Sequence, residues 1–300
     1  MHEKGTHTMN FLANLISGLS LGSIYALIAL GYTMVYGIAK MLNFAHGDII
    51  MIGAFAILVS VNTLGLPGWA AILIGVVCCI ALGVLIERVA YKPLRKSGPL
   101  SVLITAIGVS YLLQNVALLI FGSGQQSFPT KIISIPAVEL GALTIKGESV
   151  ATLAVTTVIM IVLSLFISKT KIGKAMRAVS EDKDAAELMG ISVNATISVT
   201  FAIGSGLAAV AGLFYGCTYG FIGPYTGSMP GIKAFVAAVF GGIGSIPGAM
   251  LGGILLGVIE NLSKAYISPE LSDAIVFGVL IVILIVKPTG LLGKQLREKV

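Results

Sequence analysis

Uninterrupted apolar runs are the feature that most limits what this chain can fold into. Residues 49–86 contain no Asp, Glu, Lys or Arg. A bilayer core about 30 Å thick is crossed by about 20 apolar residues in a helix, so this run is long enough for two spans. Leu64-Gly-Leu-Pro-Gly68 divides it, because Pro and Gly favour a tight turn. Only 11% of the residues are charged, against about 25% in soluble domains, which excludes an ordinary globular protein.

The other apolar runs predict an all-α, polytopic membrane helix bundle of about nine segments. They cover residues 11–38, 100–121, 150–168, 196–220, 231–259 and 267–286. The run at 231–259 is cut by a glycine-rich stretch at 241–248, so two short crossings or two half-helices are expected there. Residues 122–149 are more polar and are expected to form an exposed loop with a short strand-like piece. Residues 1–300 are therefore expected to be one transmembrane domain in contact with membrane lipid.

Basic residues concentrate in residues 88–98, in residues 169–190 and in the tail that starts at Lys287. This distribution predicts the orientation. Cytoplasmic loops of membrane proteins carry an excess of Lys and Arg. The three places are expected inside, with the carboxyl terminus, whereas the amino terminus and loops 122–149 and 260–273 are expected outside. The net charge of +6 arises from these loops and does not indicate a nucleic-acid partner. The inner bases are Arg88, Lys92, Arg95, Lys96, Lys169, Lys171, Lys174, Arg177, Lys183, Lys287, Lys294, Arg297 and Lys299.

Two stretches of the chain align loosely with one internal gap. Residues 66–91 and 246–266 each contain Pro-Gly, an apolar run, Leu-Gly-Val, Ile-Glu and Ala-Tyr. In the predicted topology Glu87 ends its segment inside and Glu260 ends its segment outside, which describes an inverted repeat. Such repeats place a substrate path at their interface. Convergence of two glycine-rich apolar helices is the alternative.

A charged segment at residues 169–195 interrupts the apolar pattern. Ser180 is expected to cap a short helix that ends at Gly190. Such a helix on the cytoplasmic side suits a groove in a partner protein; a solvated connecting loop is the alternative. The residues expected to form this surface are Ser180, Glu181, Asp182, Asp184, Ala185, Ala186, Glu187 and Gly190.

Asp184-Ala185-Ala186, three further residues and Gly190 resemble the Glu-Ala-Ala-x-x-x-Gly loop of ABC importer permeases, with Asp in the first position. "NFAHGD" (43–48), "IERVAYKPLR" (86–95), "GKAMRAVSED" (173–182) and "FGGIGSIPGAMLGG" (240–253) resemble the branched-chain amino acid permeases of that class, over about residues 12–293. The resemblance implies a coupling helix docked on an ATPase, a second and homologous permease subunit, two cytoplasmic ATPases, a periplasmic or extracellular binding protein, and a place in a bacterial-type inner membrane.

The same resemblance implies a transporter subunit that is not an enzyme and binds no cofactor itself. No Gly-x-x-x-x-Gly-Lys-Ser/Thr phosphate loop is present in the sequence, so ATP would be used by partner subunits. The alternatives are a permease for another small polar solute (an amide, urea or a sugar), an autonomous secondary carrier, and an intramembrane enzyme.

Polar residues inside apolar segments are candidates for the translocation path, because burying them in lipid is costly. They are Asn43, His46, Asp48 and Lys233, and His46 and Asp48 are close enough in sequence to neutralise each other. Structural pairing or snorkelling to an interface is the alternative for each. Cys and His residues show no zinc-ligand spacing, so no metal site is expected.

Small residues that recur every four positions predict close helix packing near the carboxyl end. One stripe has Gly244, Gly248 and Gly252, and the adjacent stripe has Ala249, Gly253 and Gly257. Static packing and a hinge are both open for these glycines.

Overall fold

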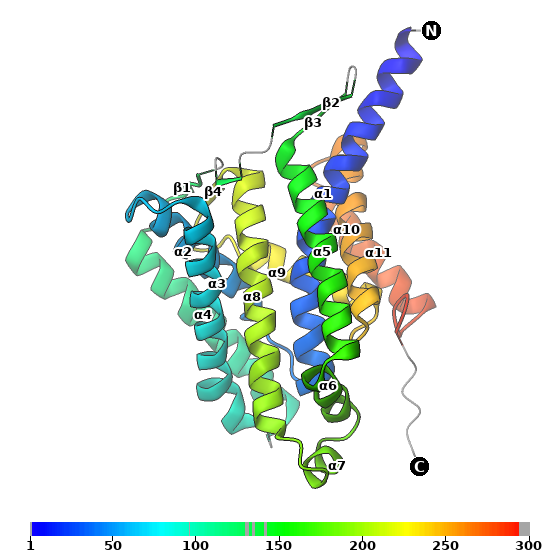
Figure 1. Cartoon of the computed structure of the whole chain (residues 1–300). Helices are drawn as coiled ribbons and strands as arrows, with labels where there is room; N and C mark the ends of the chain where they lie inside the picture. Colours follow the sequence, from blue (N-terminus) through cyan, green and yellow to red (C-terminus); the bar gives the residue numbers. More distant parts are fainter. Residues whose placement is uncertain (1, 96, 130–131, 134–135, 141–142, 294–300) are drawn as a thin grey trace.

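The computed structural model describes residues 2–95, 97–129, 132–133, 136–140 and 143–293. Lys96, Lys294, Arg297 and Lys299, which contribute to the predicted orientation, lie outside the described residues. The chain is built almost entirely from helices, with four short strands (Figure 1). The elements are α1 (His2–Ala39), α2 (His46–Asn62), α3 (Gly68–Ile86), α4 (Pro99–Phe121), β1 (Gln126–Ser127), β2 (Val138–Leu140), β3 (Leu143–Ile145), α5 (Gly147–Lys169), α6 (Lys171–Glu181), α7 (Lys183–Leu188), α8 (Val193–Tyr219), β4 (Phe221–Ile222), α9 (Ser228–Gly241), α10 (Ile246–Tyr266) and α11 (Ser272–Val286).

Six helices in the described part of the chain are long and apolar enough to cross a membrane. They are α1 from Asn10 onward, α3 with its continuation to Leu94, α4, α5, α8 and α10, and the shorter apolar helices are α2, α9 and α11. The prediction of an all-α membrane bundle is therefore confirmed.

The predicted breaks fall where the helices end. α2 ends at Asn62 and α3 begins at Gly68, after Pro67 in extended conformation. α9 ends at Gly241 and α10 begins at Ile246, where the Ser245 hydroxyl accepts a hydrogen bond from the Gly248 amide at 3.2 Å. Pro and Gly act here because neither continues a helix easily.

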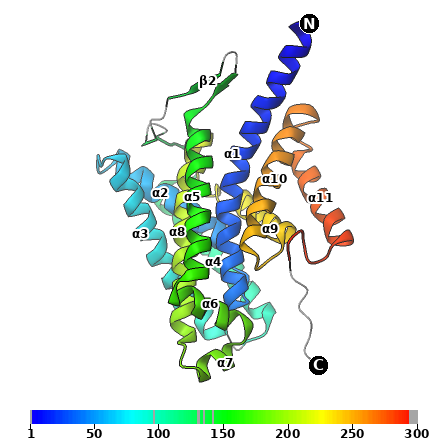
Figure 2. The same ribbon diagram turned by 45° about the vertical axis from the view of Figure 1, so that its right-hand side comes forward.

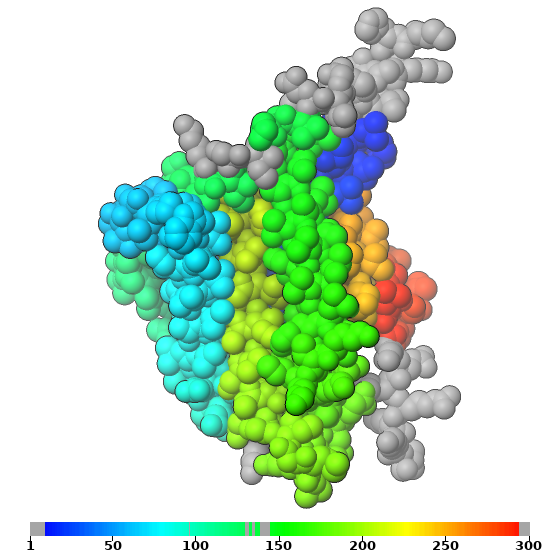
Figure 3. Space-filling view, in the orientation of Figure 1, coloured from blue at the N-terminus to red at the C-terminus, as the bar shows by residue number. Residues whose placement is uncertain are grey.

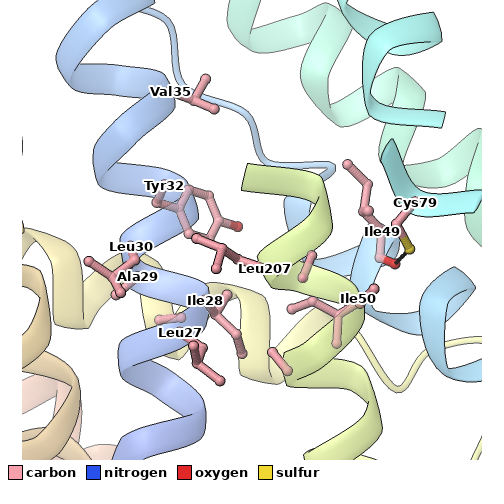
Figure 4. Packing of buried hydrophobic residues seen from close by; sticks show 14 of the residues in the cluster. Leu27, Ile28, Ala29, Leu30, Tyr32, Val35, Ile49, Ile50, Cys79 and Leu207 are labelled. Carbon is pink, nitrogen blue, oxygen red and sulfur yellow. Dashed lines mark hydrogen bonds between the residues drawn. The ribbon is translucent and has the colours of Figure 1, made fainter. Parts of the chain in front are cut away.

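Helices α1 and α8 form the centre of the bundle. Residues 24–30 of α1 are almost completely buried, and most of the apolar part of α8 is buried as well. Figure 4 shows part of this core, with side chains of α1, Leu207 of α8, and Ile49 and Ile50 of α2. The Cys79 thiol donates to the Ile49 carbonyl at 3.4 Å and joins α3 to α2 in the same region.

The outer helices expose large apolar side chains instead of burying them. α3, α4, α5 and α11 present residues such as Leu119, at 85% exposure, and Ile285, at 77%. Figure 3 shows α5 running along one face of the molecule from end to end. A surface of this kind fits lipid or a second membrane subunit, because soluble monomers rarely expose contiguous apolar area of this extent.

The strands and the charged segment lie at opposite ends of the bundle (Figures 1 and 2). β2 pairs with β3 in an antiparallel hairpin that precedes α5, and β1 pairs with β4 next to the end of α8. α6, α7 and the start of α8 lie at the other end. The loop predicted at residues 122–149 therefore contains short strands, as expected from its composition.

Candidate functional site

The first turns of α2 and α9 cross in direct backbone contact. A Cβ added at Gly47 would clash with the Gly227 carbonyl oxygen and would come within 3.1 Å of the Gly231 Cα. A side chain at Gly227 would in turn clash with Gly47. Glycine is required on both sides because no side chain fits between two backbones at this separation. The crossing places His46 and Asp48, on either side of Gly47, deep in the bundle.

His46 is enclosed by apolar and aromatic groups. Its ring meets Tyr32 edge to face, with centroids 4.9 Å apart, and a side chain at Gly31 would collide with it. Its Nε2 has no hydrogen-bond partner among the described residues, and the residue is only 1% exposed. Such an atom is a polar group held in an apolar pocket.

Asp48 is paired with an amide and not with His46. Its Oδ1 accepts a hydrogen bond from Gln114 Nε2 at 3.0 Å, and the same nitrogen lies 3.2 Å from the Ser110 and Ser228 hydroxyls. These contacts join α2, α4 and the first residue of α9. The idea that His46 and Asp48 neutralise each other is therefore wrong, because a partner on another helix occupies the carboxylate.

Asn43 lies in the linker between α1 and α2. Its Oδ1 accepts a hydrogen bond from the Tyr91 hydroxyl at 2.9 Å, and the side chain is buried. Tyr32, Tyr36 and Phe235 lie around it. Three of the four predicted path residues thus lie close together along the chain, with Asn43 in the linker and His46 and Asp48 in the first turn of α2.

Lys233 lies apart from them in a buried ionic network. Its Nζ is 2.8 Å from Glu260 Oε1 and 2.7 Å from Asp273 Oδ1, so α9, α10 and α11 meet at one ammonium group. Glu260 also accepts from Lys264 at 2.6 Å and from the Tyr25 hydroxyl at 2.8 Å. The two bases and the two acids of this network balance in charge. Lys233, which was predicted for the path, is therefore paired with carboxylates of α10 and α11.

Glu87 occupies a related position at the other end of the bundle. It begins a π-helical turn, Glu87–Tyr91, after α3 and is fully buried. Its carboxylate pairs with the Arg95 guanidinium and accepts from the Ser198 hydroxyl at 2.6 Å. Sequence reasoning placed both glutamates at span ends but missed Tyr25, Gln114 and Ser198, because their partners are far away along the chain.

The charged segment forms two helices and not one. α6 ends at Glu181, and Asp182 adopts an extended conformation before α7 begins. Ser180 does not cap the second helix, because it lies within α6 and its hydroxyl donates to the Arg177 carbonyl. Asp182 is the cap, since its Oδ1 accepts from the Asp184 and Ala185 amides at 2.9 and 3.0 Å. The extended backbone at Asp182 interrupts the helix there, so this carboxylate and not the Ser180 hydroxyl lies at the start of α7.

The end of α7 matches the predicted glycine stop. Gly190 has φ +80°, and the Ile191 amide donates to the Ala186 carbonyl at 3.0 Å. This is the pattern in which a glycine in left-handed conformation ends a helix. Leu188 and Met189 next to it are 89% and 81% exposed, whereas Ala186 is buried. An apolar pair therefore projects from this end of the bundle beside the acidic side chains of Asp184 and Glu187.

Lys183 ties α7 to the centre of the bundle. Its Nζ donates to the Ala39 carbonyl at 2.9 Å, at the last residue of α1. Burial, followed by the positive charges of Arg95 and Lys40, holds the pKa of Lys183 below its ordinary value. Lys40 has φ +58°, an uncommon conformation for a residue other than glycine. The sequence indicates Lys183 only as one of the basic residues that predict the orientation.

The glycine stripes of α10 face two different neighbours. Gly248 and Gly252 lie against Gly241 and Ala237 of α9, whereas Gly253 and Gly257 lie against Ala26 and Gly22 of α1. Gly244 is not part of either helical stripe, because it lies in the turn before α10 with φ +91°.

The sequence matches the family model described as "Branched-chain amino acid transport system / permease component" over residues 14–284. This chain belongs to that permease family. It is 46% identical to the high-affinity branched-chain amino acid transport system permease protein LivH of Escherichia coli K12, over 97% of this chain and 98% of that protein. It is 44% identical to BraD of Pseudomonas aeruginosa, with the same coverage.

A more distant similarity connects the chain with a second permease protein of the same named system. It is 26% identical to LivM of Escherichia coli K12, over 91% of this chain and 68% of that protein. The family is one of transport permeases and not of enzymes, and the apolar helices make this chain a multi-pass membrane protein.

Proposed function

We propose that this chain is the permease subunit of an ATP-binding-cassette importer for branched-chain or other apolar amino acids in the bacterial inner membrane. The names of the relatives LivH and BraD support the substrate class. A second, homologous permease subunit completes the membrane part, since LivH and LivM are two permease proteins named for one system. An external binding protein delivers the amino acid, and this chain binds no cofactor.

The observation that carries the proposal is the surface at the end of α7. Residues 169–195 form the coupling segment, and two cytoplasmic ATPases, which use the ATP, dock on α7. Leu188 and Met189 offer an exposed apolar anchor, and Asp184 and Glu187 offer charge beside it. An apolar centre with a charged rim is typical of a protein interface. The Asp182 cap and the Gly190 stop fix the direction in which α7 projects.

We propose that nine segments enter the membrane and form an inverted repeat of α1–α4 and α8–α11. α1 packs along α10, and α8 packs along α3; α9 packs against α1, and α2 packs against α8. α3 and α10 run in opposite directions (Figure 1).

Individual residues follow the same correspondence. Tyr25 donates to Glu260, and Ser198 donates to Glu87. Tyr25 and Ser198 are separated along the chain by as many residues as Glu87 and Glu260. Gly31 of α1 and Gly204 of α8, which lie against each other, have that separation too. Two halves that exchange equivalent contacts support a repeat better than the sequence alignment did.

The orientation follows from the charges at the two ends. Arg95, Lys171 and Lys183 lie with α6 and α7 at one end, which the excess of bases favours as the cytoplasmic side. The amino terminus is then outside and the carboxyl terminus inside. A cysteine at residue 185 is expected to resist an impermeant thiol reagent added outside, whereas one at residue 268 is expected to react; the opposite pattern would overturn the orientation.

The coupling assignment is tested by Glu187→Lys and Gly190→Val. The first reverses a charge on the proposed docking surface. The second strains a left-handed backbone position by about 1–2 kcal/mol, although no atom lies within 4 Å of the added Cβ. Both variants are expected to insert normally but to lose co-purification with the ATPase or ATP-driven uptake. Glu270→Lys, in the loop between α10 and α11, is the matched control. Unchanged uptake in both coupling variants would contradict the assignment.

A further inference from the structure

A cavity of about 360 Å³ opens between α1, α5, α8 and α10, at the end of the bundle opposite α7. None of the path residues predicted from the sequence lines it. Its wall has an apolar part, with Ile16 and Leu21 of α1, and a charged part, with Lys146, Glu148 and Lys264. Asn261 adds an amide beside Lys264. The volume lies within the range of about 300–1,000 Å³ typical of small-molecule sites.

The charged part of the wall holds both signs. Within the described part of the chain, neither the Lys146 ammonium nor the Glu148 carboxylate has an ion pair or a side-chain hydrogen bond. Lys264, by contrast, is held by Glu260 at 2.6 Å. Lys146, which is exposed, precedes α5 and Glu148 lies in its first turn, so both residues lie at the same rim of the cavity. Among the described residues, an acid and a base without a side-chain partner thus lie at one small cavity, where they can bind a ligand that itself carries both charges.

We propose that this cavity is the outer receiving site for the amino acid zwitterion. Lys146 and Lys264 bind the α-carboxylate, Glu148 binds the α-ammonium group, and Ile16 and Leu21 contact the apolar side chain. The inference rests on the proposed function and adds to it a place where the substrate stops after leaving the binding protein. Charge complementarity at both ends of the ligand selects free amino acids over apolar acids or amines. The site binds weakly, because part of its wall is open to solvent and release toward the path must follow.

A zwitterionic lipid headgroup carries an ammonium group and an anion as well. The two sources share their chemistry, but only the free amino acid also brings a short branched side chain for Ile16 and Leu21. Membranes that contain only phosphatidylglycerol remove the zwitterionic lipid and therefore separate the two.

The test uses the assembled permease–ATPase complex in phosphatidylglycerol nanodiscs, without binding protein. Cys78, which is exposed, is first replaced by Ser, and Ser149 in the cavity wall is replaced by Cys as a reporter. Leucine at millimolar concentration is expected to slow modification of the reporter by a methanethiosulfonate several-fold. 4-Methylpentanoate lacks the ammonium group and isopentylamine lacks the carboxylate, so neither is expected to protect. A reporter at residue 268, outside the cavity, is expected to be insensitive to all three.

Charge-neutral variants identify the partners. Glu148→Gln and Lys146→Gln are each expected to raise the leucine concentration needed for protection about tenfold, since a charge-assisted contact is lost. Glu270→Gln, at the same end but outside the cavity, is expected to leave it unchanged. The proposal is overturned if leucine gives no protection or if the single-charge analogues protect equally well. It is also overturned if the reporter is protected in the absence of leucine, and only in membranes that contain phosphatidylethanolamine.

ATP-driven uptake by the wild-type complex with its binding protein is measured in parallel. Leucine uptake without leucine protection would overturn the receiving site and leave the proposed function intact. Absence of uptake of any branched-chain or other apolar amino acid would contradict the proposed function, and the receiving site with it.

Discussion

The network around Glu260 makes a graded prediction about stability. Its carboxylate is fully buried, and the Lys233 side chain is only 7% exposed, whereas the Lys264 side chain is 35% exposed. Removing one member of a buried ion pair costs about 3–5 kcal/mol, because the other charge is left without a partner. Lys233 retains Asp273 after loss of Glu260, so the cost of Glu260→Gln is expected near the lower limit, about 3 kcal/mol.

Lys233→Met is expected to cost a similar amount, whereas Lys264→Gln is expected to cost only about 0–1 kcal/mol because water solvates that site. The double variant Lys233→Met, Glu260→Met removes both buried charges together. It is expected to cost clearly less than the two single changes combined, since the charges left without their partners, Lys264 and Asp273, have side chains that are 35% and 41% exposed to water.

Thermal unfolding in detergent measures these differences. A thiol-reactive dye reports the exposure of the buried Cys79 and Cys217 once Cys78 is replaced by Ser. At roughly 2–4 °C per kcal/mol, the buried substitutions are expected to lower Tm by about 6–12 °C and Lys264→Gln by at most about 4 °C. Equal shifts for Lys233→Met and Lys264→Gln, or a double variant as unstable as both single changes together, would refute the reasoning.

Two further predictions concern the α2–α9 crossing and the anchor of α7. Gly47→Ala is expected to lower stability by about 1–3 kcal/mol, because its Cβ meets the α9 backbone. The control Gly278→Ala has open space around it and is expected to be neutral or stabilising by up to about 1 kcal/mol in the same unfolding assay. Equal effects of the two changes would show that the crossing is not tight. Lys183→Met keeps the aliphatic stem but removes the 2.9 Å hydrogen bond to Ala39. It is expected to raise several-fold the number of ATP molecules hydrolysed per amino acid carried, whereas the control Lys174→Met, at an exposed residue, is not. An unchanged ratio would show that Lys183 takes no part in coupling hydrolysis to transport.

The helix boundaries could be predicted because they depend on local chemistry. A charge-free run, a Pro-Gly pair or a glycine-rich stretch acts within a few residues, as the breaks before Gly68 and Ile246 show. The break inside the charged segment was harder, because Ser180 and Asp182 are both capping residues two positions apart. Only the backbone conformation at Asp182 decides between them.

The polar contacts could not be predicted, because they depend on which helices become neighbours. Tyr25 meets Glu260 from the far end of the chain, and Gln114 meets Asp48 across a helix–helix contact. A buried acid predicts that some partner exists, since an unpaired buried charge is costly. It does not indicate which helix supplies the partner. His46, Asp48 and Lys233 were thus recognised as unusual, but their surroundings came only from the structure.

The contacts of α7 form one continuous line into the middle of the bundle. Lys183 holds the last carbonyl of α1, and the linker that follows carries Asn43, fixed by Tyr91, before α2 begins at His46. At Gly47 that helix lies on the backbone of α9 with no side chain between them to absorb a displacement. The Lys183–Ala39 hydrogen bond, the linker 40–45 and the Gly47 backbone contact thus connect α7 with the α2–α9 crossing. Lys183→Met opens this line at its first step and leaves the crossing intact, whereas Gly47→Ala disturbs the crossing and leaves the anchor intact. If α7 acts through this line, the first change uncouples hydrolysis without loss of stability, and the second lowers stability directly.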